Sequence, residues 1–132
     1  VYPFPPHIQL EKIFAPVDVP VDIDTTEMQQ VLLNLLGNAV EVMPAPKGGK
    51  LTVRTCMPEP GWVAVDVSDA GSGIPQDVLD KIFAPFFTTK ARGTGLGLAV
   101  VRKVVDRHKG RVDVESTVGV GTTFKLFLPT AV

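Results

Sequence analysis

The sequence predicts a single domain of the α/β class. Its 132 residues suit one domain, two long stretches space their apolar residues three and four apart as helices do, and five shorter stretches have strand character. The composition, with 45% hydrophobic and 20% charged residues, is that of a globular protein with a real core. The composition therefore gives no indication of a fibrous, repeat or disordered protein.

The first elements lie in residues 1–43. Residues 1–7 form a proline-rich lead-in, and residues 8–14 are expected to form the first strand. Asp24 and Glu27 fit a capping box, which predicts a helix that runs to about Met43, before two prolines. The apolar stripe of this helix comprises Met28, Val31, Leu32, Leu35, Ala39 and Val42.

Residues 51–57 and 62–69 alternate as two strands joined by a Pro-Glu-Pro-Gly turn. In the second strand Val65 and Val67 share one face, and Asp69 falls in phase with them. Because side chains alternate between the two faces of a strand, the Asp69 carboxylate should point toward the buried side.

The rest of the chain predicts a short helix from Pro75 to about Phe83, a loop over residues 84–94, a helix over residues 96–108 and a closing hairpin. The apolar side of the long helix is Leu98, Val101, Val104, Val105 and His108, and Gly110 is expected at its C′ position. The hairpin strands are residues 111–117 and 122–128, and Thr122 falls in phase with the inward Phe124, Leu126 and Leu128.

Charge and cysteine content exclude several classes of partner. A formal net charge of -1 gives no field to attract nucleic acid or an anionic membrane. The one cysteine, Cys56, fits a reducing compartment, and no apolar run approaches the roughly 18 residues of a membrane span. We expect a cytoplasmic domain with no direct membrane contact. Because the chain begins with valine and not with methionine, we also expect a piece of a longer protein, whose membrane attachment stays open.

Two asparagines on the first long helix are candidate ligands. Asn34 and Asn38 are four residues apart and so project from one side of the helix. A solvated polar face is the plainer interpretation of this helix alone. The alternative is that the amides face a polyphosphate: an amide oxygen is a neutral ligand for magnesium and, unlike a carboxylate, does not repel phosphate.

The segment Asp69-Ala-Gly-Ser-Gly-Ile-Pro follows a strand and is either a common aspartate-glycine turn or a base-binding site. An inward carboxylate needs a hydrogen-bond donor, and the amine of adenine is one. Guanine presents a carbonyl there, which Asp69 would disfavour. Gly71 and Gly73 would let a flat base approach the backbone, and Thr122 could reach the base directly or through water.

Gly93-Thr-Gly-Leu-Gly97 opens the last long helix, where backbone amides favour phosphate. A loop precedes it, so it is no Rossmann fingerprint, and the chain holds no Walker A loop. Lys90 and Arg92 are the basic residues near the expected phosphates. The preceding aromatics Phe83 and Phe86 are interpreted as anchors of the loop. For the two histidines, His7 has no visible partner, and His108 is expected to be structural, with positive charge at a helix end.

Four ordered motifs carry a family resemblance over about residues 8–129. Residues 30–39, Asp69 to Gly73, residues 83–90 and residues 93–98 resemble the N, G1, F and G2 boxes of the catalytic and ATP-binding domain of two-component sensor histidine kinases, in the GHKL ATPase superfamily. The resemblance implies a two-layer α/β sandwich of the Bergerat type, with a mixed sheet of about five strands backed by about three helices.

The resemblance also implies roles for the residues. Asn38 would ligate Mg²⁺, Asn34 would face the phosphates, Asp69 would read adenine, and residues 84–93 would form a lid that carries Lys90. Asn34 and Lys90 are the expected catalytic residues. The expected nucleotide site is Asn34, Asn38, Asp69, Gly71, Gly73, Ile74, Lys90, Arg92, Gly93, Thr94, Gly95, Leu96, Gly97 and Thr122, with ATP and Mg²⁺ as ligands.

The sequence departs from the family pattern in three ways. Glu41 stands where many members have a basic residue, the lid is short, and no stretch resembles the histidine-acid phosphoacceptor box. The implied function is therefore that of half an enzyme. An ATP-dependent histidine kinase domain would donate the γ-phosphoryl group to a histidine on a separate helical dimerisation domain, upstream of the lead-in, with a response regulator downstream.

Three rival interpretations remain open. An ATP-driven clamp would share the fold but usually has an acidic residue where Asn34 stands. A related protein-serine kinase, such as an anti-sigma factor, is disfavoured by the long aromatic segment of residues 83–90. A nucleotide-binding module without catalysis is kept open by Glu41.

Overall fold

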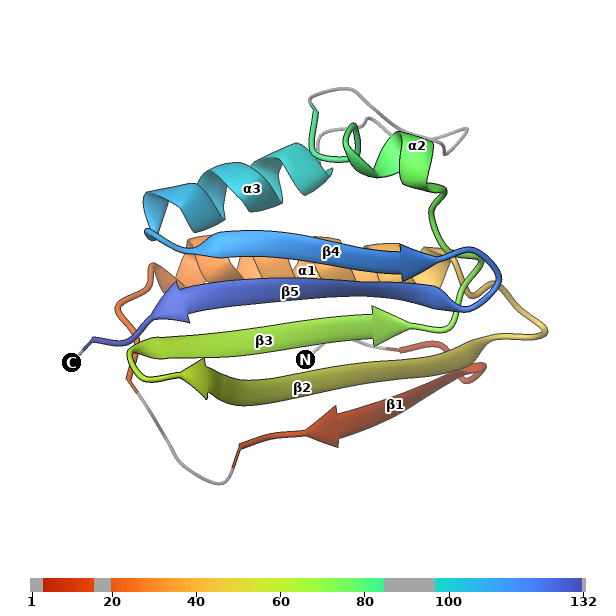
Figure 1. Cartoon of the computed structure of the whole chain (residues 1–132). Coiled ribbons are helices and arrows are strands. Elements are labelled where there is room, and N and C mark those ends of the chain that lie inside the picture. The colour runs from red at the N-terminus through yellow and green to blue at the C-terminus, as the bar shows by residue number, and fades with distance from the viewer. Residues whose placement is uncertain (1–3, 16–19, 85–96, 132) are drawn as a thin grey trace.

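The computed structural model describes residues 4–15, 20–84 and 97–131 of the chain. Within these residues, five strands and three helices follow one another in the order shown in Figure 1. Their bounds are β1 Ile8–Ile13, α1 Thr25–Glu41, β2 Gly49–Glu59, β3 Trp62–Asp69, α2 Gln76–Leu79, α3 Gly97–Arg107, β4 Arg111–Thr117 and β5 Gly121–Pro129. The elements match those expected from the sequence, apart from shifts of one to a few residues at their ends.

The strands form one mixed sheet in the order β1-β2-β3-β5-β4. β1 pairs with β2 in parallel, through a crossover that contains α1, and all other neighbours are antiparallel. β5 lies between β3 and β4, so the final hairpin brings its last strand into the interior of the sheet. The predicted α/β class with a mixed five-stranded sheet and three helices is confirmed.

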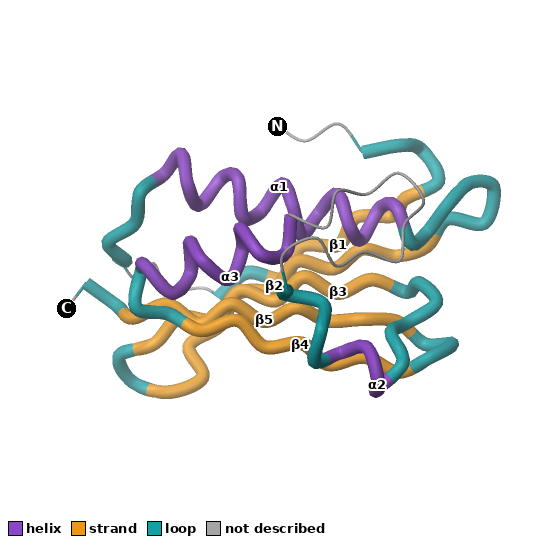
Figure 2. The backbone as a smooth tube through the Cα atoms, turned by 90° about the horizontal axis from the view of Figure 1, so that it is seen from above, coloured by secondary structure: helices purple, strands orange, loops and turns teal. Residues whose placement is uncertain are grey.

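Helices α1 and α3 lie side by side over one face of the sheet (Figure 2). They run antiparallel, because Asp24 at the start of α1 contacts His108 beyond the end of α3, while Asn34 further along α1 contacts Gly97 at the start of α3. The domain therefore has two layers, with the core between the sheet and the two helices.

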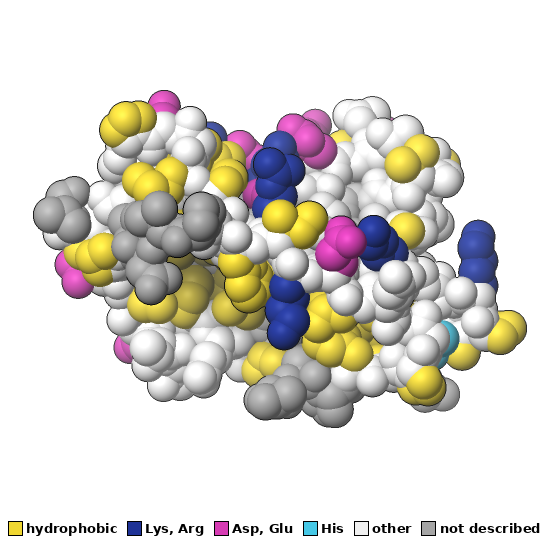
Figure 3. All heavy atoms as spheres, turned by 90° about the horizontal axis from the view of Figure 1, so that it is seen from below, with side chains coloured by type: hydrophobic (Ala, Val, Ile, Leu, Met, Phe, Trp, Pro, Cys, Tyr) yellow, Lys and Arg dark blue, Asp and Glu magenta, His cyan; other side chains and the backbone are white. Residues whose placement is uncertain are grey.

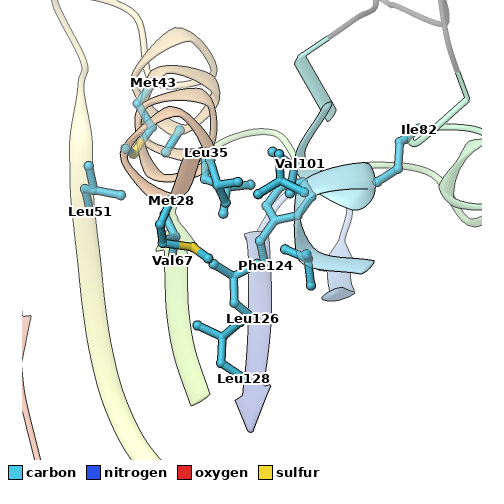
Figure 4. Close-up of a cluster of buried hydrophobic side chains, with 14 of the residues drawn as sticks. Met28, Leu35, Met43, Leu51, Val67, Ile82, Val101, Phe124, Leu126 and Leu128 are labelled. Atoms are coloured by element: carbon cyan, nitrogen blue, oxygen red, sulfur yellow. The ribbon is translucent and has the colours of Figure 1, made fainter. Parts of the chain in front are cut away.

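The core side chains come from both layers and interdigitate (Figure 4). Leu35 of α1, Leu51 of β2, Val101 of α3 and Leu126 of β5 are each at most 1% exposed. The predicted inward stripe of α1 is confirmed for Met28, Val31, Leu35 and Ala39. Val42 is the exception, with 37% of its surface exposed, because α1 ends at Glu41 and Val42 serves as its C-cap.

The predicted capping box forms only in part. The Asp24 side chain accepts a hydrogen bond from the Glu27 amide at 3.0 Å, as an N-cap does. The Asp24 amide donates to His108 Nε2 at 3.0 Å, and the Glu27 carboxylate pairs with Arg107. The second half of the box is thus replaced by contacts that join the start of α1 to the end of α3.

His108 is structural, as expected, but it does not act as a charge at a helix end. Its Nδ1 lies 2.8 Å from the Val104 carbonyl oxygen, which can only accept, and its Nε2 accepts from the Asp24 amide. Both bonds form together only on a neutral ring with its proton on Nδ1. The ring therefore links two helix ends through hydrogen bonds.

Replacing His108 with alanine is expected to lower the free energy of unfolding by about 1 kcal/mol, since the Asp24 amide loses its partner and the Val104 carbonyl keeps only its bond from the backbone amide of residue 108. Urea titration of the purified chain measures this. His7→Ala is the matched control, because His7 is bonded through its main-chain carbonyl, which accepts from the Gly49 amide at 3.2 Å. Equal stability losses in the two variants would contradict the role assigned to His108.

The end of α3 corrects the prediction for Gly110. Lys109, and not Gly110, has the left-handed conformation of the C′ residue, with φ 61°, and the Gly110 amide bonds the Val105 carbonyl at 3.0 Å. Gly110 is required for another reason. A Cβ at this position would lie 2.2 Å from the Phe127 carbonyl oxygen, so only glycine lets the chain pass β5 so closely.

Figure 3 shows the molecule from below, along the edge strand β1, where basic and acidic side chains are interspersed with scattered apolar ones. Lys50 and Glu11, on neighbouring strands at this edge, form an ion pair at 3.0 Å. Charged side chains on an edge strand oppose pairing with another sheet. Within the described residues, no helix has the length and apolarity to cross a membrane.

Candidate nucleotide-binding site

Asp69 and Thr122 lie at one end of the sheet, on the right in Figure 1, where β3 ends and β5 begins. α3 begins at Gly97 over the middle of the sheet. The later turns of α1, which carry Asn34 and Asn38, lie over the same end. Residues from four elements that are far apart in the sequence are thus brought together.

Asn34 is held by the protein on both sides of its amide. Its Nδ2 donates to the Gly97 carbonyl oxygen at 3.1 Å, and its Oδ1 accepts from Gln30 Nε2 at 3.0 Å. Asn34 therefore fixes the first residue of α3 against α1. Asn38 is half-buried one turn later on the same side of α1, and its carbonyl accepts the capping hydrogen bond of Val42.

Asp69 is half-buried at the end of β3. Burial raises the pKa of its carboxyl group, while hydrogen bonds from the Gly71 and Thr122 amides oppose that rise. The bond from the Gly71 amide is 2.9 Å long. The inward carboxylate thus has two hydrogen-bond donors within the protein. The expectation that its donor comes from a ligand is therefore only partly correct. Each carboxylate oxygen can accept more than one hydrogen bond, which leaves room for a ligand.

Thr122 lies directly across from Asp69 on β5, and only 6% of its surface is exposed. The inward orientation predicted for it is confirmed. Its hydroxyl lies 2.8 Å from the hydroxyl of Ser116, its cross-strand neighbour on β4. Ser116 also accepts a hydrogen bond from the Ile74 amide at 2.7 Å, and so ties the loop after Asp69 to the β4–β5 hairpin.

Ser116 is a site residue that the sequence reasoning missed. A signal was present, since Ser116 follows the half-buried Val112 and Val114 at intervals of two and therefore faces inward. An inward serine at the end of a strand, opposite an inward threonine, indicates a paired hydroxyl group.

The glycines after Asp69 are needed for a packing reason that the sequence did not indicate, and their expected approach to a base stays a prediction. A Cβ on Gly71 would lie 2.6 Å from the Val42 side chain, and a Cβ on Gly73 would lie 2.4 Å from the Thr117 carbonyl oxygen. The space beside both residues is filled by the protein itself. These glycines thus let the loop pack against the C-cap of α1 and the end of β4.

The phosphate-binding part of the predicted site lies largely outside the described residues. This applies to the expected contacts Lys90, Arg92, Gly93, Thr94, Gly95 and Leu96, which stay predictions. Gly97 is described and opens α3. Ile74 is half-buried and packs against the core, which leaves its expected contact with a base a prediction.

Phe83 is an anchor, as interpreted from the sequence. Its ring packs edge-on against Phe124, with centroids 6.2 Å apart, and the Arg102 guanidinium lies 5.8 Å from its centroid. Phe86 lies outside the described residues. A surface hollow lined by Pro58, Glu59, Trp62, Arg111 and Phe127 lies at the opposite end of β3 and holds none of the predicted site residues.

Comparison with known proteins gives the family. Residues 23–132 match the family model of histidine kinase-, DNA gyrase B- and HSP90-like ATPases. Sensor kinase CckA of Brucella abortus is 44% identical over 126 residues, which cover 83% of this chain and 13% of CckA. Sensor histidine kinase ZraS of Escherichia coli is 46% identical over 109 residues, which cover 83% of this chain and 23% of ZraS. The chain thus spans less than a quarter of either relative.

Solved structures agree. The mycobacterial sensor histidine kinase MprB superposes with a TM-score of 0.83 at 32% identity, over 94% of this chain and 83% of that one. The nucleotide-free catalytic domain of histidine kinase ThkA superposes with a TM-score of 0.81 at 36% identity, over 93% of this chain and 79% of that one. The chain therefore belongs to the family of histidine kinase-, DNA gyrase B- and HSP90-like ATPases, as a catalytic ATP-binding domain of the sensor histidine kinase type.

Proposed function

We propose that this domain binds ATP with Mg²⁺ and donates the γ-phosphoryl group to a histidine on a separate helical dimerisation domain. The observation that carries the proposal is the half-buried Asp69 carboxylate beside Thr122, at the end of the sheet over which the last turns of α1 lie, with the start of α3 bonded to α1 at Asn34. A carboxylate there accepts from the amine of adenine. The start of an 11-residue helix lies nearby to favour phosphate.

The residues present fit a magnesium ion bound with the nucleotide. Among the described residues there is no cluster of three or more His, Cys, Asp or Glu side chains that could hold a metal by themselves. A cation here would take one oxygen from Asn38 and its other ligands from phosphate and water, as Mg²⁺ commonly does. When bound, the ion neutralises charge that develops during phosphoryl transfer.

The acceptor histidine belongs to another domain in this proposal. Both ring nitrogens of His108 are used in hydrogen bonds that join α1 to α3. His7 lies just before β1 and is followed directly by Ile8 and not by an acidic residue. A helical domain upstream of residues 1–7 would supply the acceptor, and a response regulator would receive the phosphoryl group from it, on the cytoplasmic side of any membrane.

A clamp ATPase is the rival proposal, and the position of Asn34 counts against it. Hydrolysis needs a base to activate water. Asn34 is neutral, and its amide is held in place by hydrogen bonds with Gly97 and Gln30. The domain is therefore expected to hold ATP with little turnover until the acceptor domain is present.

Transfer in trans tests the proposal. The purified chain is incubated with Mg²⁺, γ-labelled ATP and the separately purified helical domain of a related sensor kinase. We expect acid-labile, base-stable label on that domain's histidine and little free phosphate from the chain alone. Rapid multiple-turnover hydrolysis by the chain alone would contradict the proposal and favour a clamp ATPase.

Replacing Asn38 with alanine is expected to lower the affinity for ATP about ten- to a hundredfold in the presence of Mg²⁺, the range of a hydrogen bond or ligand contact to a charged group. The affinity measured in EDTA should change little, because the lost contact is to the cation. Gln29→Ala removes an exposed amide from the same helix and serves as the control. A loss of equal size with and without Mg²⁺ would argue against Asn38 as the metal ligand.

A further inference from the structure

Ser116 lies on β4, next to two of the expected site residues, Ile74 and Thr122. It stands in one cross-strand row with Thr122 on β5 and Asp69 on β3. Its hydroxyl lies 2.7 Å from the Ile74 amide nitrogen, 3.1 Å from the Gly121 carbonyl oxygen and 2.8 Å from the Thr122 hydroxyl. One side chain is thus bonded to three groups around the site.

Counting protons fixes the direction of these bonds. The Gly121 carbonyl can only accept, so the single proton of Ser116 goes to it. The Ile74 amide can only donate, so it occupies one lone pair of the Ser116 oxygen. The proton between Ser116 and Thr122 must then come from Thr122.

These bond directions determine whether the site presents hydrogen-bond donors or acceptors to a ligand. Thr122 has given its proton to Ser116, so its oxygen has only lone pairs left for another partner. Asp69, directly across on β3, likewise offers acceptor oxygens. A ligand that reaches this end of the sheet meets two acceptors side by side.

We propose that Ser116 is a positioning residue that orients the Thr122 hydroxyl as a hydrogen-bond acceptor, so that the site selects a purine with an amine, and not a carbonyl, at its six position. This inference rests on the proposed function and adds to it a second selectivity element beside Asp69. An amine has two protons and can satisfy both acceptors directly or through one water. A carbonyl at the same place faces acceptors from both side chains, and a water between them can satisfy only part of this mismatch.

The test is the ratio of dissociation constants for ATP and its six-oxo analogue ITP, measured by calorimetry on the purified chain with Mg²⁺. In Ser116→Ala the Thr122 hydroxyl is free to turn and donate to the carbonyl of ITP. We expect the ratio of the dissociation constant for ITP to that for ATP to fall about tenfold, which corresponds to the contribution of one hydrogen bond. A merely structural role would weaken both nucleotides equally, so an unchanged ratio overturns the inference.

Matched variants isolate the effect. The hydroxyls of Ser68 on β3 and Thr123 on β5 lie 2.7 Å apart and form an equivalent pair on the opposite face of the sheet. Ser68→Ala removes this pair and should keep the wild-type ratio of dissociation constants. Ser116→Thr retains the hydroxyl and should keep it as well. In a Thr122→Val background the Ser116→Ala change should have no further effect on the ratio, and a persistent effect contradicts the coupling.

A second readout does not depend on nucleotide binding. NMR of the wild-type chain should place the Thr122 hydroxyl proton close to the Ser116 oxygen and the Ser116 proton close to the Gly121 carbonyl. The reverse arrangement overturns the inference even when Ser116→Ala does not fold. If the wild-type chain binds neither nucleotide, the proposed function fails, whereas the NMR result still decides the order of the hydroxyls.

Discussion

Asp69→Asn is expected to lower the affinity of the domain for ATP about a hundredfold, because a charged acceptor for the adenine amine is replaced by an amide whose NH₂ group repels it. The protein itself should keep its fold, since an asparagine oxygen can still accept from the Gly71 and Thr122 amides. Calorimetric titration with ATP measures the loss. Asp66→Asn makes the same charge change on the opposite face of β3 and should leave the affinity unchanged.

The stability of the wild-type domain has a predicted pH dependence, which Asp69→Asn removes. Burial raises the pKa of Asp69 above the 3.8 that an unfolded chain would show. The stability that the protonated group contributes is therefore fully present below pH 3.8 and is lost as the pH rises through the higher pKa of the folded protein. At neutral pH the ionised carboxylate costs stability, so Asp69→Asn should melt at the wild-type temperature or above it. A variant that melts well below wild type at pH 7 would mean that lost folding explains the lost binding.

Gly73→Ala is expected to destabilise the domain by about 2–4 kcal/mol, from backbone strain and a main-chain clash together. Gly73 has φ 79°, which an alanine adopts at a cost. Its Cβ would also lie 2.4 Å from the Thr117 carbonyl oxygen and 2.8 Å from the Val118 Cα, neither of which is the end of a flexible side chain. Urea or thermal unfolding measures the loss.

Gly119 offers a control that separates the two causes. Its φ of 82° is nearly that of Gly73, but a Cβ there would meet nothing within 4 Å. Gly119→Ala should therefore show the strain alone, about 1–2 kcal/mol. Equal losses at the two positions would show that the approach of the loop to β4 is not tight.

The sequence predicted the elements of the fold because local signals defined them. Asp24 marks the start of α1 by its own hydrogen bond, and the inward stripe of α1 follows from its period. The order of the strands could not be predicted in this way. The insertion of β5 between β3 and β4 depends on pairing between residues as distant as Asp69 and Thr122, which no local pattern specifies.

The errors at individual residues share a cause. Glycine usually signals conformational freedom, so the sequence predicts Gly110 at the C′ position, which is wrong, and Gly71 at the approach of a base, which stays a prediction. Both are required where the chain passes close to other parts of the protein, at Phe127 and at Val42. The second half of the capping box does not form for a similar reason, since the Asp24 amide bonds His108, just after α3, and the Glu27 carboxylate pairs with Arg107 of α3.

The prediction of the site rests on single residues and not on the hydrogen bonds that join them. Asn34, Asp69 and Thr122 can be proposed from the sequence because each residue type suits a nucleotide, and because Asp69 and Thr122 fall in phase with the inward residues of their strands. Ser116 was missed because its importance depends on three partners supplied by the loop after β3 and by β5. The contact of Asn34 with Gly97 is likewise visible only once α1 and α3 are packed together.

The most direct test of the central claim is a calorimetric titration of the purified chain with ATP and with GTP in the presence of Mg²⁺. A carboxylate at Asp69 that reads an amine predicts saturable binding of ATP and binding of GTP at least about a hundredfold weaker. Equal affinities for the two nucleotides, or binding of neither, would contradict an adenine site at this end of the sheet.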